Sequence, residues 1–238
     1  MKVEEYYKYQ AIARGLHSVE DVQTLVRANT RLYDCIILDW LPLKKDAAIY
    51  EVACGPGIFL HWLRSRGYTN IRGSDSSKAQ IDLAEAGGLP AKLADSLLEL
   101  RALEADSLDC IVGFDFYEHL PKEIMLDFIS DTHRLLRPGG RLILRGPNGD
   151  SPLVGRSLFN DITHHWAMTS TAFRAVLQMV GFERVEFRDD ALASIQRHRL
   201  LKVPITWLAQ IFLRMLLRAA TREELACLSA SFFVLAVK

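Results

Sequence analysis

Five short apolar runs alternate with helical patterns between Ala47 and Asn148, and this alternation leaves few folds open to the chain. The helical stretches begin near Ile58, Ser77, Leu97 and Pro121, between the runs AAIYEV, NIRGSD, PAKLAD, LDCIVGFD and RLILRGPN. Strand, helix and strand at this spacing are typical of a mostly parallel sheet with helices on both faces. We therefore expect a doubly wound α/β fold, in which the strand after the Pro138-Gly139-Gly140 turn begins at Arg141.

Helical and strand patterns continue on both sides of this region. From Ser18, a capping residue and an acidic first turn open a long helical pattern that Pro42 closes, so residues 1–45 are expected to form an N-terminal helical segment. The main domain then covers 46–238, with a helix over STAFRAVLQMV and further strands at FERVEF and SFFVLAV. Within it, 149–168 and 191–228 interrupt the pattern, as additions over the ligand crevice of doubly wound folds usually do.

Composition narrows the class of partner and the compartment. The 238 residues hold 29 Lys and Arg against 29 Asp and Glu, so no long-range field draws the chain to nucleic acid, and no nucleic-acid partner is expected. The cysteines are far apart, with no CxxC pair and no zinc-finger spacing, which indicates reduced thiols and no metal site. Because the first residues lack the apolar run of a signal peptide, we expect a cytoplasmic protein.

The run EVACGPG leaves the first predicted strand and enters a helix through Gly55 and Gly57. Glycine is needed in such a turn where backbone must approach a ligand or adopt dihedrals that side chains resist. The third glycine of a dinucleotide motif is replaced by Leu60, and the Gly-Lys-Ser/Thr of a phosphate loop is absent. The two glycines alone fit an ordinary turn as well as a ligand site.

Acidic residues end four successive predicted strands, at Glu51, Asp75, Asp95 and Asp115. One such acid is usually a solvated loop residue or a helix cap. Parallel strands, however, bring their carboxyl ends to the same edge of a sheet, where ligands bind. Asp75 follows Gly55 by 20 residues, a spacing at which an acid can accept both ribose hydroxyls.

These motifs resemble the class I S-adenosylmethionine-dependent methyltransferases, in the small-molecule group related to ubiquinone-biosynthesis and sugar methyltransferases. EVACGPG, GSDSS, LADS and FDFYEHL with RLLRPGGRLIL are similar to successive motifs of that family, and DITHHW to its THxxxFT stretch. Ala53 departs from it by standing where the family has its first glycine. The resemblance implies a Rossmann-like, seven-stranded, mostly parallel sheet with an antiparallel last strand, N-terminal helices and a helical insertion before the last strand.

The resemblance also implies roles for single residues. Glu51 would bind the methionine amino group through the loop, Asp75 the ribose and Asp95 the adenine amino group. The full set of expected cofactor residues is Glu51, Ala53, Cys54, Gly55, Gly57, Asp75, Ser76, Ala94, Asp95, Ser96 and Asp115. S-adenosylmethionine carries its own activated methyl group and leaves as S-adenosylhomocysteine, so the protein need supply no metal.

A hydroxyl acceptor must lose a proton, and a histidine titrates in the right range to take it. His119 is the first candidate base and His164 the second. The alternatives are that His119 caps the helix after Pro121 and that the histidine pair at 164 and 165 is structural. The remaining candidate acceptor contacts, each of which also has an ordinary turn or capping explanation, are Tyr117, Asn148, Asp161 and His165.

The expected reaction is methyl transfer to a hydroxyl of a small molecule, with a sugar in cell-surface polysaccharide or nucleotide-sugar biosynthesis as the first candidate acceptor. The alternatives are an isoprenoid quinone or other lipid, a nitrogen of an aminosugar, or a cofactor-binding scaffold without activity. The apolar segment 204–219 is expected to pack against the sheet. Peripheral contact with the inner face of the membrane, or a dimer contact, is the alternative there, and the oligomeric state stays open.

Overall fold

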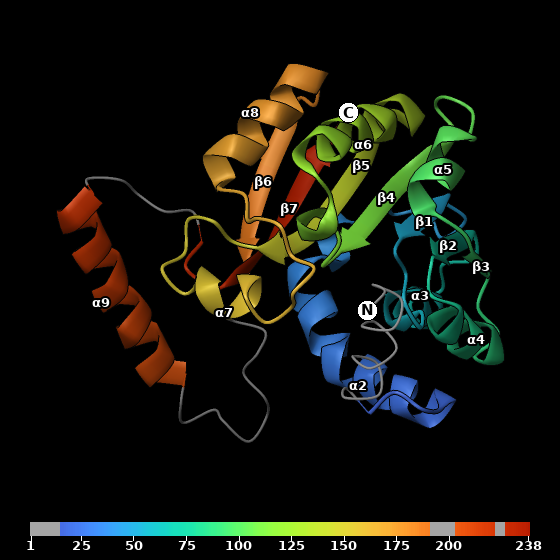
Figure 1. Cartoon of the computed structure of the whole chain (residues 1–238), viewed down its shortest axis with the longest axis horizontal. Helices are drawn as coiled ribbons and strands as arrows, with labels where there is room; N and C mark the ends of the chain where they lie inside the picture. The colour runs from blue at the N-terminus through green and yellow to red at the C-terminus, as the bar shows by residue number, and fades with distance from the viewer. Residues whose placement is uncertain (1–14, 191–202, 222–226) are drawn as a thin grey trace.

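A single seven-stranded sheet organises the computed structural model, which describes residues 15–190, 203–221 and 227–238 (Figure 1). The strand order is β3-β2-β1-β4-β5-β7-β6, with parallel pairing from β3 to β5 and antiparallel pairing of β7 with both neighbours. The strands are β1 (Ile49–Val52), β2 (Ile71–Asp75), β3 (Ala91–Leu93), β4 (Leu108–Phe114), β5 (Leu136–Pro147), β6 (Arg184–Asp189) and β7 (Ser231–Val237). The predicted fold class is confirmed, including the antiparallel last strand.

The start of β5 differs from the prediction. The strand begins at Leu136 and not at Arg141, because Leu136 already pairs with Leu108 of β4 across an irregularity in the register. The predicted Pro-Gly-Gly stop does end the preceding helix at Leu135. The backbone N–H of Gly139 nevertheless donates to the carbonyl of Lys238 at 2.7 Å, so the turn pairs with the end of the chain.

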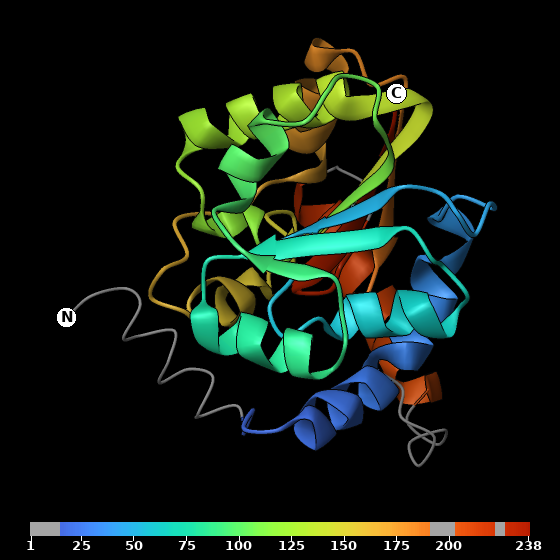
Figure 2. The same cartoon turned by 90° about the vertical axis from the view of Figure 1, so that its right-hand side faces the viewer.

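Helices cover both faces of the sheet, as Figure 2 shows. The core on one face joins the strands to α2, α3 and α4, and the core on the other joins them to α5, α6 and α8. The helical elements are α2 (Val19–Ile36), η1 (Leu38–Trp40), α3 (Ile58–Ser65), α4 (Lys78–Ala86), α5 (Ser96–Arg101), η2 (Tyr117–His119), α6 (Lys122–Leu135), α7 (Val154–Leu158), α8 (Ser170–Val180) and α9 (Val203–Thr221).

The N-terminal helix α2 is part of the main core. Its Ser18 cap accepts a hydrogen bond from the Asp21 amide, as the predicted helix start requires. The ring centroid of Tyr33 lies 5.3 Å from the ring centroids of both Phe59 and Trp62. Residues 1–14 of the expected N-terminal segment lie outside the described part of the chain.

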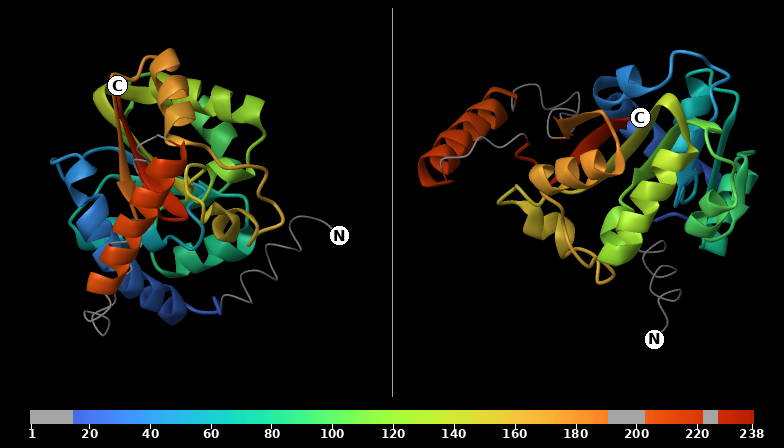
Figure 3. Two further views of the ribbon diagram at one scale, coloured as in Figure 1. Left: turned by 90° about the vertical axis from the view of Figure 1, so that its left-hand side faces the viewer. Right: turned by 90° about the horizontal axis from the view of Figure 1, so that it is seen from above.

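The expectation that residues 204–219 pack against the sheet is wrong for four large apolar side chains of α9, although Ile211, Leu213 and Leu217 are partly buried. The helix reaches the edge of the sheet through Arg214, which lies 3.9 Å from Asp189 at the end of β6. Helix α9 otherwise stands away from the sheet (Figures 1 and 3), and Leu208, Phe212, Met215 and Leu216 are exposed. A broad apolar face predicts that a helix packs against another surface, but it does not identify that surface. In the described ranges, no helix has the length and apolar character needed to cross a bilayer.

The packing of α2 against α3 gives a test of what holds the fold. We expect Phe59→Ala to lower the free energy of unfolding by about 3–5 kcal/mol, because it empties a fully buried aromatic site. Arg66→Ala removes a half-exposed ion pair with Asp34 and should cost less than about 1 kcal/mol. Urea unfolding of the two variants measures both values. A loss in Arg66→Ala as large as that in Phe59→Ala would contradict this and show that the ion pair holds α2 as strongly as the aromatic cluster does.

Candidate functional site

A cavity of about 780 Å³ opens at the carboxyl ends of β1, β2, β4 and β5. The residues that line it fall into two groups. The β1–β2 end of the cavity consists of Glu51, Ala53, Cys54, Gly55, Asp75 and Ser76, and the β4–β5 end consists of Asp115, Glu118, His119, Arg145, Asp161 and His164. Between them lie aromatic side chains, including Tyr33 and Phe59. Helix α2 and residues from α7 and the segment after it, between 156 and 164, form the walls. Part of the predicted 149–168 insertion therefore borders the cavity.

The turn after β1 has the backbone that its glycines allow. Gly55 and Gly57 have φ values of 53° and 78°, in the left-handed region, and a Cβ on Gly57 would lie 2.1 Å from Leu89. Ala53 also has a positive φ, 48°, although it carries a side chain. That conformation costs an alanine about 1–2 kcal/mol relative to right-handed backbone. Ala53, which stands where the family has a glycine, therefore adopts a left-handed backbone in spite of this cost.

Two side chains hold this turn in place: Asp75 at the end of β2 and Ser96 at the start of α5. Asp75 accepts hydrogen bonds from the amide of Gly55 at 2.9 Å and from the amide of Ser77 at 2.7 Å. Burial raises the pKa of Asp75, and these amides oppose that shift. Ser96 accepts from the amide of Ala53 at 3.1 Å and donates to the carbonyl of Ser74 at 2.9 Å. Ser96 therefore shapes the turn from behind, within the core.

Glu51 presents a buried carboxylate to the β1–β2 end of the cavity. The residue is 5% exposed, and its Oε2 has no hydrogen-bond partner among the described residues. Burial, and then the neighbouring Asp75, raise its pKa well above the ordinary value. A buried acceptor without a partner costs free energy, which a cationic or hydrogen-donating ligand group would recover. This orphan oxygen is the feature of the site that most clearly fits a ligand with an amino group.

Four of the predicted cofactor residues lie outside the lining of this cavity: Gly57, Ala94, Asp95 and Ser96, the last of which supports the turn from within the core. Asp95 accepts hydrogen bonds from the amides of Leu97 and Leu98 and so caps α5. Ala94 donates its amide to the carbonyl of Asp75, and Gly57 is buried behind the turn. β3 lies one strand beyond β2, at the edge of the sheet, which sets its tip apart from the other three acids.

At the β4–β5 end, Arg145 is held between two carboxylates. Its Nη1 donates to Asp115 at 2.6 Å and its Nη2 to Asp190 at 3.0 Å. These two acids keep the pKa of Arg145 above its ordinary value against the opposing effect of burial. Asp115, predicted as a cofactor residue, has a φ of 50° and is engaged by this arginine. Arg145 thus fixes the loop after β4.

His119 lies in η2 and lines the cavity. The cap of α6 is Pro121, without a side-chain hydrogen bond, so His119 is not the helix cap that its position also suggested. Its Nδ1 lies 2.9 Å from the hydroxyl of Thr163, which donates to Asp161 at 2.6 Å. Burial, and then His164, lower the pKa of His119.

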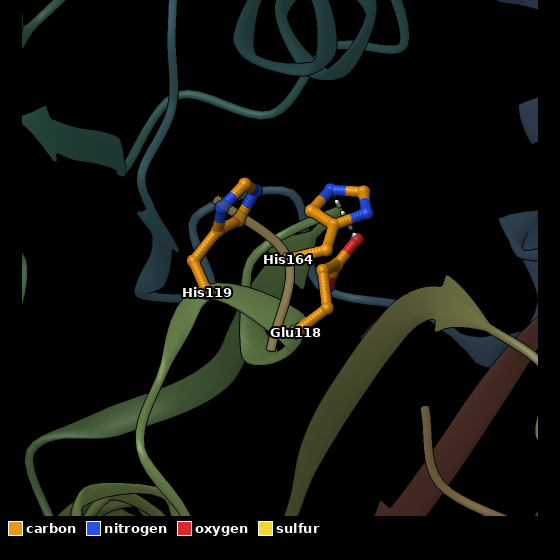
Figure 4. Close-up of side chains that lie close together, drawn as sticks. All are labelled: Glu118, His119 and His164. Atoms are coloured by element: carbon orange, nitrogen blue, oxygen red, sulfur yellow. Dashed lines mark ion pairs between the residues drawn. The ribbon is translucent and has the colours of Figure 1, made fainter. Parts of the chain in front are cut away.

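His164 faces His119, with ring centroids 4.6 Å apart. Its Nδ1 lies 3.1 Å from the carbonyl oxygens of both Ser157 and Leu158. Its Nε2 lies 3.8 Å from the Oε1 of Glu118, a residue that is 1% exposed (Figure 4). Two segments far apart in the sequence therefore bring two imidazoles and a buried carboxylate together.

Two of the other predicted acceptor residues, Tyr117 and Asn148, are used by the fold. Tyr117 is fully buried and its hydroxyl donates to the carbonyl of Pro147. Asn148 is fully buried, and its side chain donates to the carbonyls of Cys227 and Ser229. His165 is exposed and does not line the described cavity, whereas Asp161 does. We therefore assign neither Tyr117 nor Asn148 to an acceptor.

Sequence reasoning missed two residues that line the β4–β5 end, Glu118 and Arg145, and also Thr163, which contacts His119 without lining the cavity. Glu118 stands inside the FDFYEHL motif but was outside the strand-tip pattern that selected the acids. Arg145 could have been identified from the sequence, because an arginine inside the apolar run RLILRGPN is expected to be buried only with an acidic partner. Thr163 had no such signal, since its contact with His119 joins residues 44 apart through a loop.

The comparisons with known proteins agree with this architecture. A family model described as a methyltransferase domain matches residues 24–186. A curated relative, an uncharacterized 37.1 kDa protein in transposon TN4556 of Streptomyces fradiae, is 30% identical over 128 residues. That stretch is 51% of this chain and 36% of the relative, so the match spans about a third of the relative's length.

Solved structures show the same fold at low sequence identity. A SAM-dependent methyltransferase from Archaeoglobus fulgidus is 19% identical with a TM-score of 0.69, over 98% of this chain and 99% of that one. The phosphoethanolamine N-methyltransferase 2 of Haemonchus contortus, in complex with S-adenosyl-L-methionine, is 16% identical with a TM-score of 0.59, over 90% of this chain and 57% of that one. Since the family model covers more than half of the chain, the protein belongs to the methyltransferase-domain family, whose methyl donor is S-adenosylmethionine.

Proposed function

We propose that this methyltransferase acts on a hydroxyl group of a small polar molecule, with a sugar as the best-fitting acceptor. The polarity of the β4–β5 end of the cavity supports this most strongly. Its lining combines Asp115, Glu118, Arg145 and Asp161 with two imidazoles. Such groups can donate further hydrogen bonds to a hydroxyl-rich molecule or accept them from it, whereas an oily molecule would cover them and offer no hydrogen bonds in return.

The β1–β2 end would hold the cofactor. Glu51 has the orphan oxygen to accept from the amino group of the methionine portion, and Asp75 has further lone pairs for the ribose hydroxyls. When bound, S-adenosylmethionine supplies a methyl group on a positively charged sulfur, which is already activated for transfer. The chain's own residues then need to orient the acceptor and remove its proton.

His119 is the proposed general base, with His164 as its neighbour. The hydroxyl proton of Thr163 goes to Asp161, so the Thr163 oxygen accepts from His119 Nδ1–H. This fixes the tautomer in which Nε2 of His119 carries a lone pair rather than a proton. As the hydroxyl oxygen bonds the methyl carbon and the carbon–sulfur bond breaks, the hydroxyl proton would pass to that nitrogen.

The main rival acceptor is an isoprenoid quinone or another lipid. The exposed apolar side chains of α9 give that rival a place for an oily tail, but no described residue of α9 lines the cavity. Incubating host extract with the enzyme and methyl-deuterated cofactor separates the two. We expect the label in the polar fraction that contains glycans and nucleotide sugars. Label in the lipid fraction alone would replace the sugar with a lipid, and label on nitrogen would replace O-methylation.

Asp75→Ala tests the cofactor end. The variant should bind S-adenosylhomocysteine more weakly by about 1–3 kcal/mol, because the ribose hydroxyls and the amide of Gly55 both lose an acceptor. Calorimetry gives the affinity, and Asp82→Ala, on the exposed face of α4, serves as the matched control. If Asp75→Ala bound S-adenosylhomocysteine as tightly as the wild type does, Asp75 would not be a cofactor-binding residue.

His119→Ala tests the base and separates an enzyme from a scaffold. Turnover should fall at least about tenfold, the lower part of what a general base contributes, while affinity for S-adenosylhomocysteine stays within about twofold. Single-turnover rates and calorimetry measure the two quantities. An unchanged rate would exclude His119, and a wild-type protein that binds cofactor but methylates nothing in host extract would favour the scaffold.

A further inference from the structure

Three side chains at the β4–β5 end of the cavity, Glu118, His119 and His164, lie close enough together to hold a metal ion. No metal site was predicted from the sequence. Figure 4 shows the carboxylate of Glu118 and the imidazoles of His119 and His164 pointing toward one another. One ligand-type atom from each lies within 4.8 Å of the other two. Glu118 and His119 come from η2, whereas His164 comes from the segment after α7.

The hydrogen bonds of His164 direct a lone pair toward this cluster. Carbonyl oxygens only accept hydrogen bonds, so the Nδ1 of His164 carries the proton that it donates to Ser157 and Leu158. In the neutral imidazole, Nε2 then carries the lone pair, and this nitrogen lies 3.8 Å from Oε1 of Glu118. A metal-binding histidine is oriented in the same way, by a hydrogen bond from its other nitrogen.

The hydrogen bonds of His119 have the same effect. Its Nδ1 donates to Thr163, whose own proton goes to Asp161, and the lone pair is therefore on Nε2. Asp161 is buried and accepts both the hydroxyl and the amide of Thr163, at 2.6 and 2.9 Å. A carboxylate thus orients this imidazole through one intervening hydroxyl, as outer-shell carboxylates orient metal ligands.

Glu118 supplies the independent sign of a ligand. It is 1% exposed, and its Oε2 has no hydrogen-bond partner in the described part of the chain. The 3.8 Å separation from His164 exceeds hydrogen-bond length. Ligand atoms held about 2.0–2.2 Å from one ion lie roughly 3–4 Å apart, so small side-chain shifts would bring this cluster to metal-binding geometry.

We infer that Glu118, His119 and His164 bind one first-row divalent cation, of the kind that two imidazoles and a carboxylate prefer. Nitrogen ligands favour Zn²⁺, Co²⁺, Fe²⁺ or Mn²⁺ over Mg²⁺ and Ca²⁺, which prefer oxygen. Three protein ligands leave coordination positions open toward the cavity, as catalytic sites do.

The cation would act on the acceptor, a role that rests on the proposed function. It would hold the acceptor hydroxyl and lower the pKa of that hydroxyl, so that the proton leaves to solvent as the oxygen bonds the methyl carbon. The electron pair of the breaking carbon–sulfur bond goes to sulfur. With the cation bound, the two imidazoles would serve as its ligands; without it, the Nε2 of His119 would take the proton directly, as proposed above.

Titration of the full chain with Co²⁺, without cofactor or acceptor, tests the site. We expect visible absorption bands that saturate at one ion per chain, and a dissociation constant raised about 10- to 100-fold or more in His164→Gln and Glu118→Gln. His133→Gln, on α6 against Phe182, is the matched control and should bind as the wild type does. Circular dichroism and affinity for S-adenosylhomocysteine show that the variants fold.

No Co²⁺ binding by the wild type, or binding that both variants retain, would overturn the inference and leave Glu118 and His164 as an ion pair. Methyl transfer is measured separately, with and without chelator. Transfer that persists after chelation, together with absent Co²⁺ binding, would refute the cation while the proposed function stands. Specific Co²⁺ binding by a protein that transfers no methyl group would support the cation site and refute the proposed function.

Discussion

The buried carboxylate of Glu51 is the interaction on which the site depends. The sheet places it at the tip of β1, next to a turn whose backbone Asp75 and Ser96 hold in place. Burial and the charge of Asp75 raise its pKa, so its ionised form costs the empty protein stability. Because the pKa is raised above the unfolded value, this cost is absent at low pH and grows as pH rises through the folded pKa. A bound ammonium group would offset it.

The periodicity of the sequence was sufficient to predict the sheet and the edge where its acids meet. Glu51, Asp75 and Asp115 line one cavity because parallel strands present their carboxyl ends together. Asp95 follows the same pattern, yet its carboxylate caps α5. The pattern alone does not distinguish an acid that caps a helix from one that faces the cavity. The early start of β5 also escaped prediction, because it depends on the pairing of Leu136 with Leu108 of β4 across an irregular register.

The β4–β5 end was harder to predict, because the partners of His119 and Arg145 lie in loops and not in regular elements. His119 was identified from its motif, but its orientation depends on Thr163 and Asp161, which a loop brings back from later in the sequence. The partners of Arg145 likewise come from β4's loop and from the end of β6. Loop geometry of this kind follows from tertiary packing and has little signal in hydrophobic periodicity.

Calorimetric titration with S-adenosylhomocysteine, together with thermal unfolding, tests the central claim in wild type and Glu51→Gln. We expect one binding site in the wild type and affinity at least about tenfold weaker in the variant, since a charged acceptor is lost. We also expect the empty variant to unfold at a higher temperature near neutral pH, because its buried group carries no charge. Absent binding by the wild type, or an equally tight complex with Glu51→Gln, would contradict the account.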